Sequence, residues 1–301
     1  LIYNLMETER DVIIIVKGGT IQGVFSAGVL AAFQKHNLYP RVHSVYGVSS
    51  GAHNAAYFLA HQTEIGGKIY YEHLYKKHKF LKDLSPKIIW HKCWQLFIHK
   101  KPFNIIDLDY ARELETMGDT KLDVKKIRTS SINFYARVFN PETFRLEYLD
   151  GKVDTINRLI QSAKVPPYAY TKIKNELYYD GGIMPTRDFI KNVVRKYPDK
   201  KILYIFNDRK TLPRVLKFLL WDLLDILFKA RYLGPMYGFK HLFSILNYPY
   251  IETLARYKNV HVVYDEANTS KRERSQERIY TSYKHGVAKG EKLLKKIGFI
   301  N

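Results

Sequence analysis

The sequence contains a single cysteine, Cys93, among its 301 residues. One thiol cannot form an internal disulfide, and its being alone excludes a zinc site built from several cysteines. Long apolar runs are missing as well, since the β-branched run at residues 12–16 is far shorter than the roughly 20 residues that span a bilayer. No signal-peptide pattern is visible, so we expect a cytoplasmic or peripheral membrane protein, with export by another route left open.

Acidic residues are scarce relative to basic ones. Asp and Glu number 29 against 49 Lys and Arg, which gives a formal net charge of +20. A surface of this charge attracts anionic partners such as phospholipid headgroups or nucleic acid, although a well-solvated lysine-rich surface accounts for it equally well. No nucleic-acid-binding motif accompanies the charge, so we expect no nucleic-acid partner. The sequence leaves the oligomeric state open.

Strand and helix patterns alternate near the start of the chain. Residues 12–16 form a continuous β-branched run, typical of a strand buried on both faces, and a glycine turn and a helical pattern follow. Residues 42–46 repeat this arrangement, with small, helix-compatible residues after them at 52–60. Strand, turn and helix repeated in this order predict parallel strands joined by right-handed crossovers. We therefore expect an α/β fold of three layers, in which a mostly parallel sheet lies between helices.

The rest of the chain fits a single domain over residues 1–301, with its core at about residues 10–210. Residues 211–301 then add a helical segment, a further strand and a C-terminal helix. The patterns predict a hairpin at 133–140 and 145–150, a helix at 155–163, strands at 176–179, 201–206 and 260–264, and a final helix at 273–296. Residues 66–123 are interpreted as short helices and loops. The apolar segment 215–228 is interpreted as a buried helix, with a lid over the site as the alternative.

A glycine-rich segment, Gly18-Gly19-Thr20-Ile21-Gln22-Gly23, follows the first strand and precedes the first helix. Glycines let backbone N–H groups approach a ligand closely, and at the start of a helix these groups stabilise negative charge. A dinucleotide site is a poor fit because no acidic residue ends a strand about 20 residues later, and a phosphate-binding loop lacks its Lys-Ser/Thr ending. The segment indicates an anion-stabilising loop, with a plain tight turn as an equal alternative when it is taken alone.

The segment Gly47-Val48-Ser49-Ser50-Gly51 follows the second strand and matches the G-x-S-x-G pattern of a nucleophile elbow. In this turn the serine has a strained conformation at the start of a helix, and the flanking glycines allow strand and helix to pack closely. The helix dipole then favours the anion that forms when the serine attacks. The pattern and its position predict Ser49 as a nucleophile and Ser50 as a candidate N-cap of the helix.

The segment Asp180-Gly181-Gly182 comes at the end of a predicted strand. A serine hydroxyl needs a base to become an effective nucleophile, and a partly desolvated carboxylate within hydrogen-bonding distance can serve. The two glycines allow a loop to bring the carboxylate close without crowding. An Asp-Gly pair is also common in ordinary turns, so this motif gains its weight from the other two.

The three motifs, in this order, resemble those of the patatin-like phospholipase family over about residues 10–210, and bacterial members above all. Flanking residues strengthen the resemblance: Ala27-Gly28-Val29-Leu30 after the first motif, Pro166-Pro167 before the aspartate and Pro185 after it. The resemblance implies a lipid acyl hydrolase of phospholipase A or esterase type that works through an acyl-enzyme on a Ser-Asp dyad. Ser49 is then the nucleophile and Asp180 the general base.

The resemblance also implies the surroundings of the dyad. Gly18, Gly19, Thr20 and Gln22 supply the oxyanion hole, and the motif glycines are Gly23, Gly47, Gly51, Gly181 and Gly182. Neither a metal nor an organic cofactor is expected. The implied substrate is a phospholipid or another lipid ester, reached through peripheral contact with an anionic membrane surface.

Two positions depart from the family pattern. The family has a third glycine where Thr20 stands and an Arg or Lys where Gln22 stands. The backbone donor survives a change from Gly to Thr if the local φ is negative. The missing cation is expected to weaken oxyanion binding, since losing one oxyanion-hole donor costs about 10²–10³ in rate. A catalytically weak or inactive lipid-binding homologue is therefore an alternative.

A Ser-His-Asp arrangement of the α/β-hydrolase type is a second alternative. Asp180 followed by His241, His261 or His285 satisfies its chain order. His53 lies one turn after Ser49, and we expect its ring to point along the helix rather than at the hydroxyl.

Overall fold

The computed structural model describes residues 10–76, 79–82, 85–171, 177–183, 187–207, 219–237, 254, 256–267 and 269–301. A central sheet has the strand order β5-β4-β2-β1-β8-β9, and β7 pairs with β4 off this path. Its strands are β1 (Val12–Val16), β2 (Val42–Gly47), β4 (Asn133–Asn140), β5 (Arg145–Asp150), β7 (Tyr179–Asp180), β8 (Lys201–Phe206) and β9 (Val260–Tyr264). All pairs among β1, β2, β4, β8 and β9 are parallel, whereas β5 and β7 run antiparallel to β4.

The central position of β1 explains its β-branched sequence, because a strand with neighbours on both sides and helices on both faces is buried all round. Successive side chains point to opposite faces. Val12, Ile14 and Val16 therefore join one apolar core, while Ile13 and Ile15 join a second core on the other face. Two cores separated by one sheet make the three layers that the sequence predicts.

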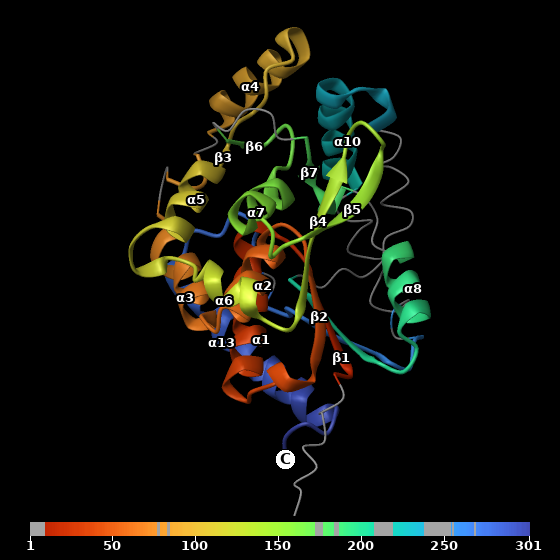
Figure 1. Ribbon diagram of the computed structural model, residues 1–301. Coiled ribbons are helices and arrows are strands. Elements are labelled where there is room, and N and C mark those ends of the chain that lie inside the picture. The colour runs from red at the N-terminus through yellow and green to blue at the C-terminus, as the bar shows by residue number, and fades with distance from the viewer. Residues whose placement is uncertain are drawn as a thin grey trace, which may run out of the picture.

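Helices cover both faces of the sheet (Figure 1). One face carries α1 (Gly23–Lys35), α2 (Ser50–Leu59), α3 (Thr63–Lys68) with the π-helical turn η3 (Ile69–Leu74) that continues it, α5 (Leu108–Thr116), α6 (Val124–Thr129), α7 (Thr155–Ala163) and α13 (Gln276–Lys296). The other face carries α8 (Arg187–Lys196), whose Phe189, Ile190 and Val193 complete the second core.

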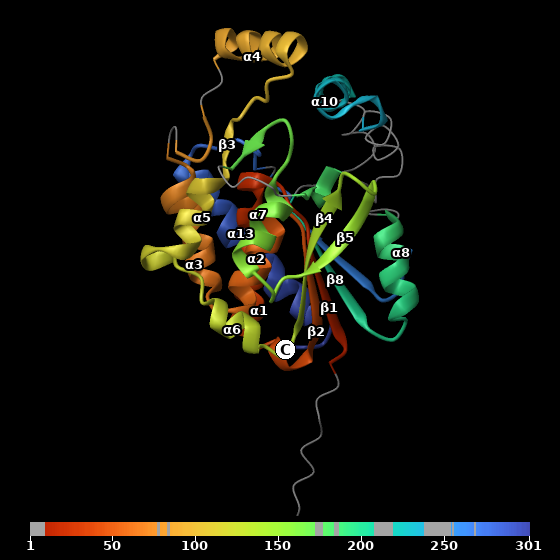
Figure 2. The same cartoon turned by 45° about the horizontal axis from the view of Figure 1, so that its top comes forward.

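Two further helices lie apart from these layers. Both α4 (Pro86–His99) and α10 (Leu219–Leu233) stand beyond the end of the sheet toward which the parallel strands point (Figure 2). A two-stranded parallel sheet of β3 (Ile106–Asp107) and β6 (Ala169–Tyr170) lies between α4 and the body of the domain. The short helical turns are η1 (Thr20–Gln22), η2 (Tyr39–Arg41), η4 (Gly118–Thr120) and η5 (Gly181–Ile183).

The contact between α1 and α13 depends on glycine. A Cβ atom at Gly28 would lie 2.1 Å from the carbonyl oxygen of Tyr283, and one at Gly286 would lie 2.2 Å from the carbonyl oxygen of Phe25. The two backbones therefore touch, which is possible only without side chains at these positions. This contact holds the C-terminal helix, which is rich in charged residues, against the first core.

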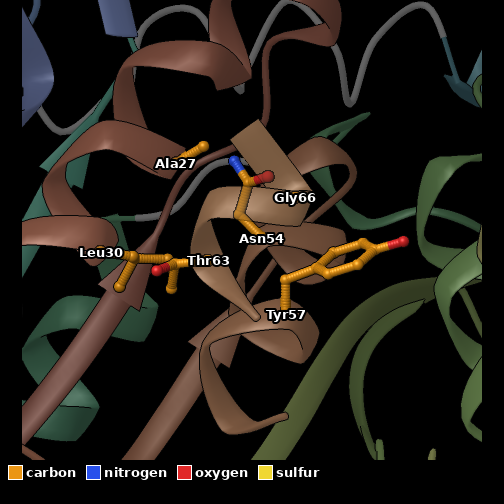
Figure 3. Close-up of a pocket in the computed structure, with 6 residues that line it drawn as sticks. All are labelled: Ala27, Leu30, Asn54, Tyr57, Thr63 and Gly66. Atoms are coloured by element: carbon orange, nitrogen blue, oxygen red, sulfur yellow. The ribbon is translucent and has the colours of Figure 1, made fainter. Parts of the chain in front are cut away.

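A small pocket between α1, α2 and α3 shows how tightly the helices pack behind the second strand (Figure 3). Its lining residues are Ala27, Leu30, Asn54, Tyr57, Thr63 and Gly66, and it is too small to hold a water molecule. Asn54 donates hydrogen bonds to the carbonyl oxygen of Gly23 (2.7 Å) and to the hydroxyl of Ser26 (2.8 Å), and its own oxygen accepts from Tyr70 (3.0 Å). These bonds fix the first turn of α1 relative to α2.

Most predicted elements are confirmed, with four corrections. The helix predicted at 273–296 begins three residues later, at Gln276, where Ser275 caps it. Residues 66–123 hold a 14-residue helix, α4, as well as short helices and loops. Of the segment predicted as a buried helix at 215–228, residues 215–218 lie outside the described part, and α10 is partly exposed rather than buried. The predicted strand at 176–179 begins outside the described residues and appears as the two-residue β7.

Candidate active site

Two loops meet at the carboxyl ends of β1 and β2. The glycine-rich segment follows β1, and the turn at Ser49 follows β2, beside it in the sheet. A Cβ atom at Gly18 would lie 2.6 Å from the Cβ of Ser49, and one at Gly51 would lie 2.4 Å from the carbonyl oxygen of Val16. Only glycines let the two loops approach this closely. The crevice beyond the carboxyl ends of parallel strands is where α/β folds bind ligands.

Ser49 has the backbone conformation of a nucleophile elbow. Its φ of 53° is positive, a region that non-glycine residues enter seldom and at an energetic cost. Ser49 itself is the N-cap of α2, and Ser50 is the first helical residue, which corrects the prediction of Ser50 as the cap. The half-buried side chain of Ser49 therefore projects at the helix N-terminus, where the dipole stabilises an anion.

The turn at Ser49 is fixed by a hydrogen bond to a buried serine on α7. The hydroxyl of Ser162 accepts a hydrogen bond from the backbone N–H of Ser49 (2.9 Å) and donates one to the carbonyl oxygen of Arg137 (2.8 Å). Ser162 is completely buried. Because its hydroxyl both donates and accepts a hydrogen bond, Ser162 fixes the orientation of the Ser49 turn relative to β4.

Asp180 reaches the same place from β7, which pairs with β4 at Val138. Its backbone N–H donates to the carbonyl oxygen of Lys164 (2.9 Å), and its Oδ1 accepts the N–H of Gly182 (2.6 Å). The Ser49 hydroxyl lies near the Asp180 carboxyl group, because Ser162 links the Ser49 turn to Arg137 on β4 and Asp180 pairs with the next residue of that strand, Val138. The structure thus brings together two side chains that are 131 residues apart in the chain (180 − 49).

Asp180 is buried, with only 6% of the residue exposed. Burial raises its pKa above the ordinary value, because removing a carboxylate from water disfavours the charged form. The hydrogen bonds from Gly182 and Ser49 and the charges of Arg137 and Lys229 lower the pKa but offset only part of this rise. A carboxyl group with a raised pKa is a stronger base than a solvated one once it is ionised.

Two buried cations lie near this carboxyl group. Arg137 on β4 donates from its guanidinium to the carbonyl oxygen of Gly181 (2.7 Å), which fixes the turn after the aspartate. Lys229 on α10 forms an ion pair with Asp225 (2.7 Å), and Asp225 also accepts from the hydroxyl of Tyr168 (2.5 Å). The positive charges of Arg137 and Lys229 favour the ionised form of Asp180 and lower its pKa against the effect of burial.

The glycine-rich loop lies against Ser49 and contains backbone donors with no acceptor in the part of the chain that the structure describes. Among the described residues, the N–H groups of Gly18 and Gly19 donate to no backbone acceptor. Asn207, at the end of β8, supports the loop from below: its side-chain amide donates to the carbonyl oxygens of Lys17 and, at 3.4 Å, of Gly18. Its oxygen accepts the N–H of Ser26 on α1 (3.1 Å). Through these bonds Asn207 fixes the loop relative to β8 and α1, and the bonds use the carbonyl groups of the loop rather than the N–H groups of Gly18 and Gly19.

Thr20 differs from the expectation. Its φ is 56°, so the condition of a negative φ under which a threonine replaces glycine at no cost is not met. A β-branched residue in the left-handed region is strained, by about 1–2 kcal/mol. The loop keeps the conformation suited to glycine although the sequence has lost the glycine.

Gln22 uses its donors elsewhere. Its backbone N–H donates to the carbonyl oxygen of Gly19 (3.1 Å), and its buried side-chain amide donates to the carbonyl oxygen of Thr269 (2.7 Å). It therefore ties the glycine-rich loop to the segment that precedes α13. Of the four residues expected to supply the oxyanion hole, Gln22 is the one whose backbone N–H and side-chain amide both already donate to described residues.

Comparison with known proteins decides the family. A family model described as patatin-like phospholipase matches residues 14–190, more than half of the chain. The chain belongs to the patatin-like phospholipase family. Membership in this family supports a lipid acyl hydrolase activity and a lipid substrate in general terms. The sequence resemblance to the family and the predicted three-layer fold are thereby confirmed.

One solved structure and one negative result complete the comparison. VipD from Legionella pneumophila is similar with a TM-score of 0.47 and 15% sequence identity, covering 96% of this chain and 67% of the VipD chain. No curated protein sequence matches the chain.

In the patatin-like chain, none of the described histidines forms a side-chain hydrogen bond to Ser49 or Asp180. His53 bonds through Nδ1 to the buried Glu115 on α5, so its ring points to another helix, not along its own helix as expected and not at the hydroxyl. His285 bonds to Asp265 (3.2 Å) rather than to Asp180, and His261 lies on β9, at the sheet edge. His241 lies outside the described residues. The Ser-His-Asp alternative gains no support from these positions.

Sequence reasoning missed three residues of the site: Ser162, Arg137 and Asn207. Each is buried, and each acts through a backbone carbonyl or N–H group of a distant segment. A charged residue within the apolar strand at 133–140 was the one visible signal, for Arg137. Groups of His, Cys, Asp and Glu that could hold a metal ion are not found in the part of the chain that the structure describes.

Proposed function

We propose that the protein is a serine acyl hydrolase of lipid esters, with Ser49 as nucleophile and Asp180 as general base. One observation carries the proposal: the hydroxyl on the strained turn after β2 lies near a buried carboxyl group from β7. Neither strain nor carboxylate burial helps the fold, so their occurrence together indicates a catalytic function. The patatin-like family supports the lipid substrate.

The first half-reaction forms an acyl-enzyme. Asp180 accepts the proton of the Ser49 hydroxyl while the oxygen attacks the ester carbonyl carbon. The carbonyl oxygen becomes an oxyanion that the free N–H groups of Gly18 and Gly19 stabilise, assisted by the N-terminus of α2. Collapse of this intermediate breaks the ester C–O bond, and the leaving alkoxide takes the proton from Asp180. Lysolipid or alcohol departs, and Ser49 carries the acyl group.

The second half-reaction hydrolyses the acyl-enzyme. Asp180 accepts a proton from a water molecule, whose oxygen attacks the acyl carbon, and the same N–H groups stabilise the second oxyanion. When the bond to Ser49 breaks, the serine oxygen takes the proton from Asp180. A fatty acid is released, and the dyad returns to its starting state without a cofactor.

Covalent labelling with a fluorophosphonate tests the nucleophile. Wild type should be labelled, Ser49→Ala should not, and its ester hydrolysis should fall by roughly 10⁴- to 10⁶-fold. Ser50→Ala is the matched control, because it removes the neighbouring hydroxyl and leaves Ser49 in place. His261→Ala and His285→Ala should keep most of the activity. Labelling of Ser49→Ala at the wild-type rate would exclude Ser49 as the nucleophile.

A second candidate function follows from Gln22. Because the residue at this position is neutral and donates to Thr269, the loop has no cation of its own in the place where the family has one. A lipid-binding homologue with little or no hydrolase activity fits this feature. It predicts that wild type takes up no fluorophosphonate label and still binds lipid vesicles. A soluble small-ester hydrolase is the third outcome, in which monomeric esters are hydrolysed and vesicles are not.

A further inference from the structure

Helix α4 exposes large apolar side chains. Trp90, Trp94 and Ile98 recur every four residues and therefore share one face of the helix. Their exposed fractions are 75%, 57% and 52%. Among the residues of this helix whose burial is described, only Leu96 is fully buried, in a small cluster with Phe103. Side chains of this size in contact with water mark a surface that binds a partner.

Helix α10 extends this surface. It contacts α4 through Phe97 and Phe228, whose ring centroids are 5.9 Å apart, and through a hydrogen bond from Arg231 to the carbonyl oxygen of Phe97 (2.7 Å). Leu223 and Leu227 on α10 are exposed as well. We define the α4–α10 apolar surface as Trp90, Trp94, Phe97, Ile98, Leu223 and Leu227.

On the α4 side, the charged residues around this surface are all basic. The segment 85–101 contains no Asp or Glu. Its basic residues are Lys87, Lys92, Lys100 and Lys101, with His91 and His99 beside them. Tryptophans and lysines around an apolar face are typical of a helix that lies in the interface of a membrane with anionic lipids.

The surface lies at the end of the molecule that carries the dyad. Both helices stand beyond the carboxyl ends of the parallel strands, where the turns bearing Ser49 and the glycine-rich loop are found (Figures 1 and 2). Lys229 on α10 is close enough to Asp180 for its charge to act on that carboxyl group. A bilayer in contact with α4 and α10 would face the end of the sheet at which the Ser49 turn lies. Among the described helices, none combines the length and the apolar character needed to cross a bilayer.

We infer that the α4–α10 apolar surface docks the protein on the surface of an anionic lipid bilayer, with the tryptophans among the acyl chains and the lysines at the headgroups. The role of this docking, which is to deliver lipid esters to Ser49, rests on the proposed function. The docking itself depends only on the surface. Its failure and the failure of the hydrolase proposal can therefore be told apart.

Vesicle flotation tests the docking. Wild type should bind vesicles of phosphatidylcholine with phosphatidylglycerol more tightly than vesicles of phosphatidylcholine alone, and salt should weaken this preference. The variant Trp90→Ala/Trp94→Ala should bind both at least about tenfold more weakly, because it loses the anchoring apolar area. Lys87→Gln/Lys101→Gln should lose only the preference for phosphatidylglycerol.

Two controls separate docking from other effects. Val153→Ala removes an exposed apolar side chain outside the surface and should bind as wild type does. Ser49→Ala should also bind vesicles normally, whatever its activity. Hydrolysis of a water-soluble monomeric ester by Trp90→Ala/Trp94→Ala should equal that of wild type, while hydrolysis of vesicle lipid should fall.

Three results would overturn the inference. The first is wild-type vesicle binding by Trp90→Ala/Trp94→Ala, and the second is no vesicle binding by wild type. The third is a wild-type dimer that this double variant converts to a monomer, since a second copy of the chain would then be what covers the surface. Loss of fluorophosphonate labelling with intact vesicle binding would remove the hydrolase proposal and leave the docking in place.

Discussion

The α1–α13 contact and the site at the carboxyl ends of β1 and β2 both depend on close approach at glycine, but they differ in what surrounds the glycines. At the first contact, helix backbones touch at Gly28 and Gly286, and both helices keep ordinary helical geometry. At the site, the chain holds Thr20 and Ser49 at positive φ and buries the carboxyl group of Asp180.

The α1–α13 contact is therefore expected to stabilise the fold, whereas the site at the carboxyl ends of β1 and β2 is expected to destabilise it. Close helix packing buries apolar surface without strain, so a change there should destabilise the fold. Left-handed backbone at non-glycine residues and a buried carboxylate oppose folding and persist where chemistry requires them. Substitutions in the two regions should therefore change stability in opposite directions.

The largest loss of stability is expected for Gly286→Val in the α1–α13 contact. A Cβ there would lie 2.2 Å from the carbonyl oxygen of Phe25, so the helices must separate. We expect the free energy of unfolding to fall by at least about 3 kcal/mol. Denaturant unfolding measures this. Ala288→Val, at an exposed position of the same helix, controls for helix propensity and should cost only about 0.5 kcal/mol. Equal losses for the two variants would contradict the close contact.

Asp180→Asn should change stability in the opposite direction. A carboxyl group whose pKa is higher in the folded chain than in the unfolded chain adds stability while protonated, and this contribution is lost as pH rises through the folded pKa. Asn cannot ionise, so the variant should melt above wild type at neutral pH, and the gap should close as pH is lowered. Its hydrolase rate should fall by about 10²–10⁴-fold.

Asp11→Asn is the matched control for this reversal. Burial tends to raise the pKa of Asp11, but the hydrogen bond and charge of Arg41 and the charge of Lys201 hold that pKa below its ordinary value. Its ionised form therefore stabilises the fold above the unfolded pKa, and Asn should lower the melting temperature at neutral pH. Melting curves across pH compare the two variants. A lower melting temperature for Asp180→Asn than for wild type at neutral pH would contradict the expectation that the buried carboxyl group of the site destabilises the fold.

The pH dependence of wild-type hydrolysis follows from the same carboxyl group. Asp180 must be ionised to accept the proton of Ser49, and its pKa is raised by burial. Activity should therefore fall as pH decreases through a value above the ordinary pKa of an aspartate. A pH profile of kcat/KM on a monomeric ester measures it. A rate that stays constant down to the ordinary aspartate range would exclude Asp180 as the base.

Thr20→Gly should produce a smaller gain. Relief of the left-handed conformation returns about 1–2 kcal/mol, while the greater freedom of glycine in the unfolded chain removes about 0.5–1 kcal/mol. The net gain of up to about 1.5 kcal/mol should appear in denaturant unfolding, with hydrolase activity at least equal to that of wild type. Asn37→Gly, at a φ of 51° outside the site, should change little because Asn tolerates this region. A loss of stability in Thr20→Gly would show that the threonine side chain supports the loop.

The smallest effect on stability is expected for Trp90→Ala/Trp94→Ala. These side chains are exposed, so the free energy of unfolding should stay within about 0.5 kcal/mol of wild type. Leu96→Ala, at the buried position of the same helix, should cost about 2–5 kcal/mol. Denaturant unfolding again decides. A large loss in the double variant would mean that the tryptophans support the fold rather than a partner.

Local patterns were sufficient for much of the fold. The β-branched run of β1, the hairpin of β4 and β5 and the glycine-flanked Ser49 each follow from neighbouring residues, since burial on both faces and tight turns constrain sequence directly. The site was found because three such local motifs occur in a characteristic order. The roles of Ser49 and Asp180 remain proposals that the experiments above address.

The sequence by itself determined the order of the elements, the position of the elbow and, through the order of three local motifs, the family, because each motif depends on residues within a few positions of one another. Only the tertiary structure decided that Ser162, Arg137 and Asn207 hold the site, that Gln22 bonds to Thr269, and that α4 is exposed. These contacts join segments that are far apart in the chain. Nothing in the local spacing of residues records such a contact, since it comes from how strands and helices pack in space.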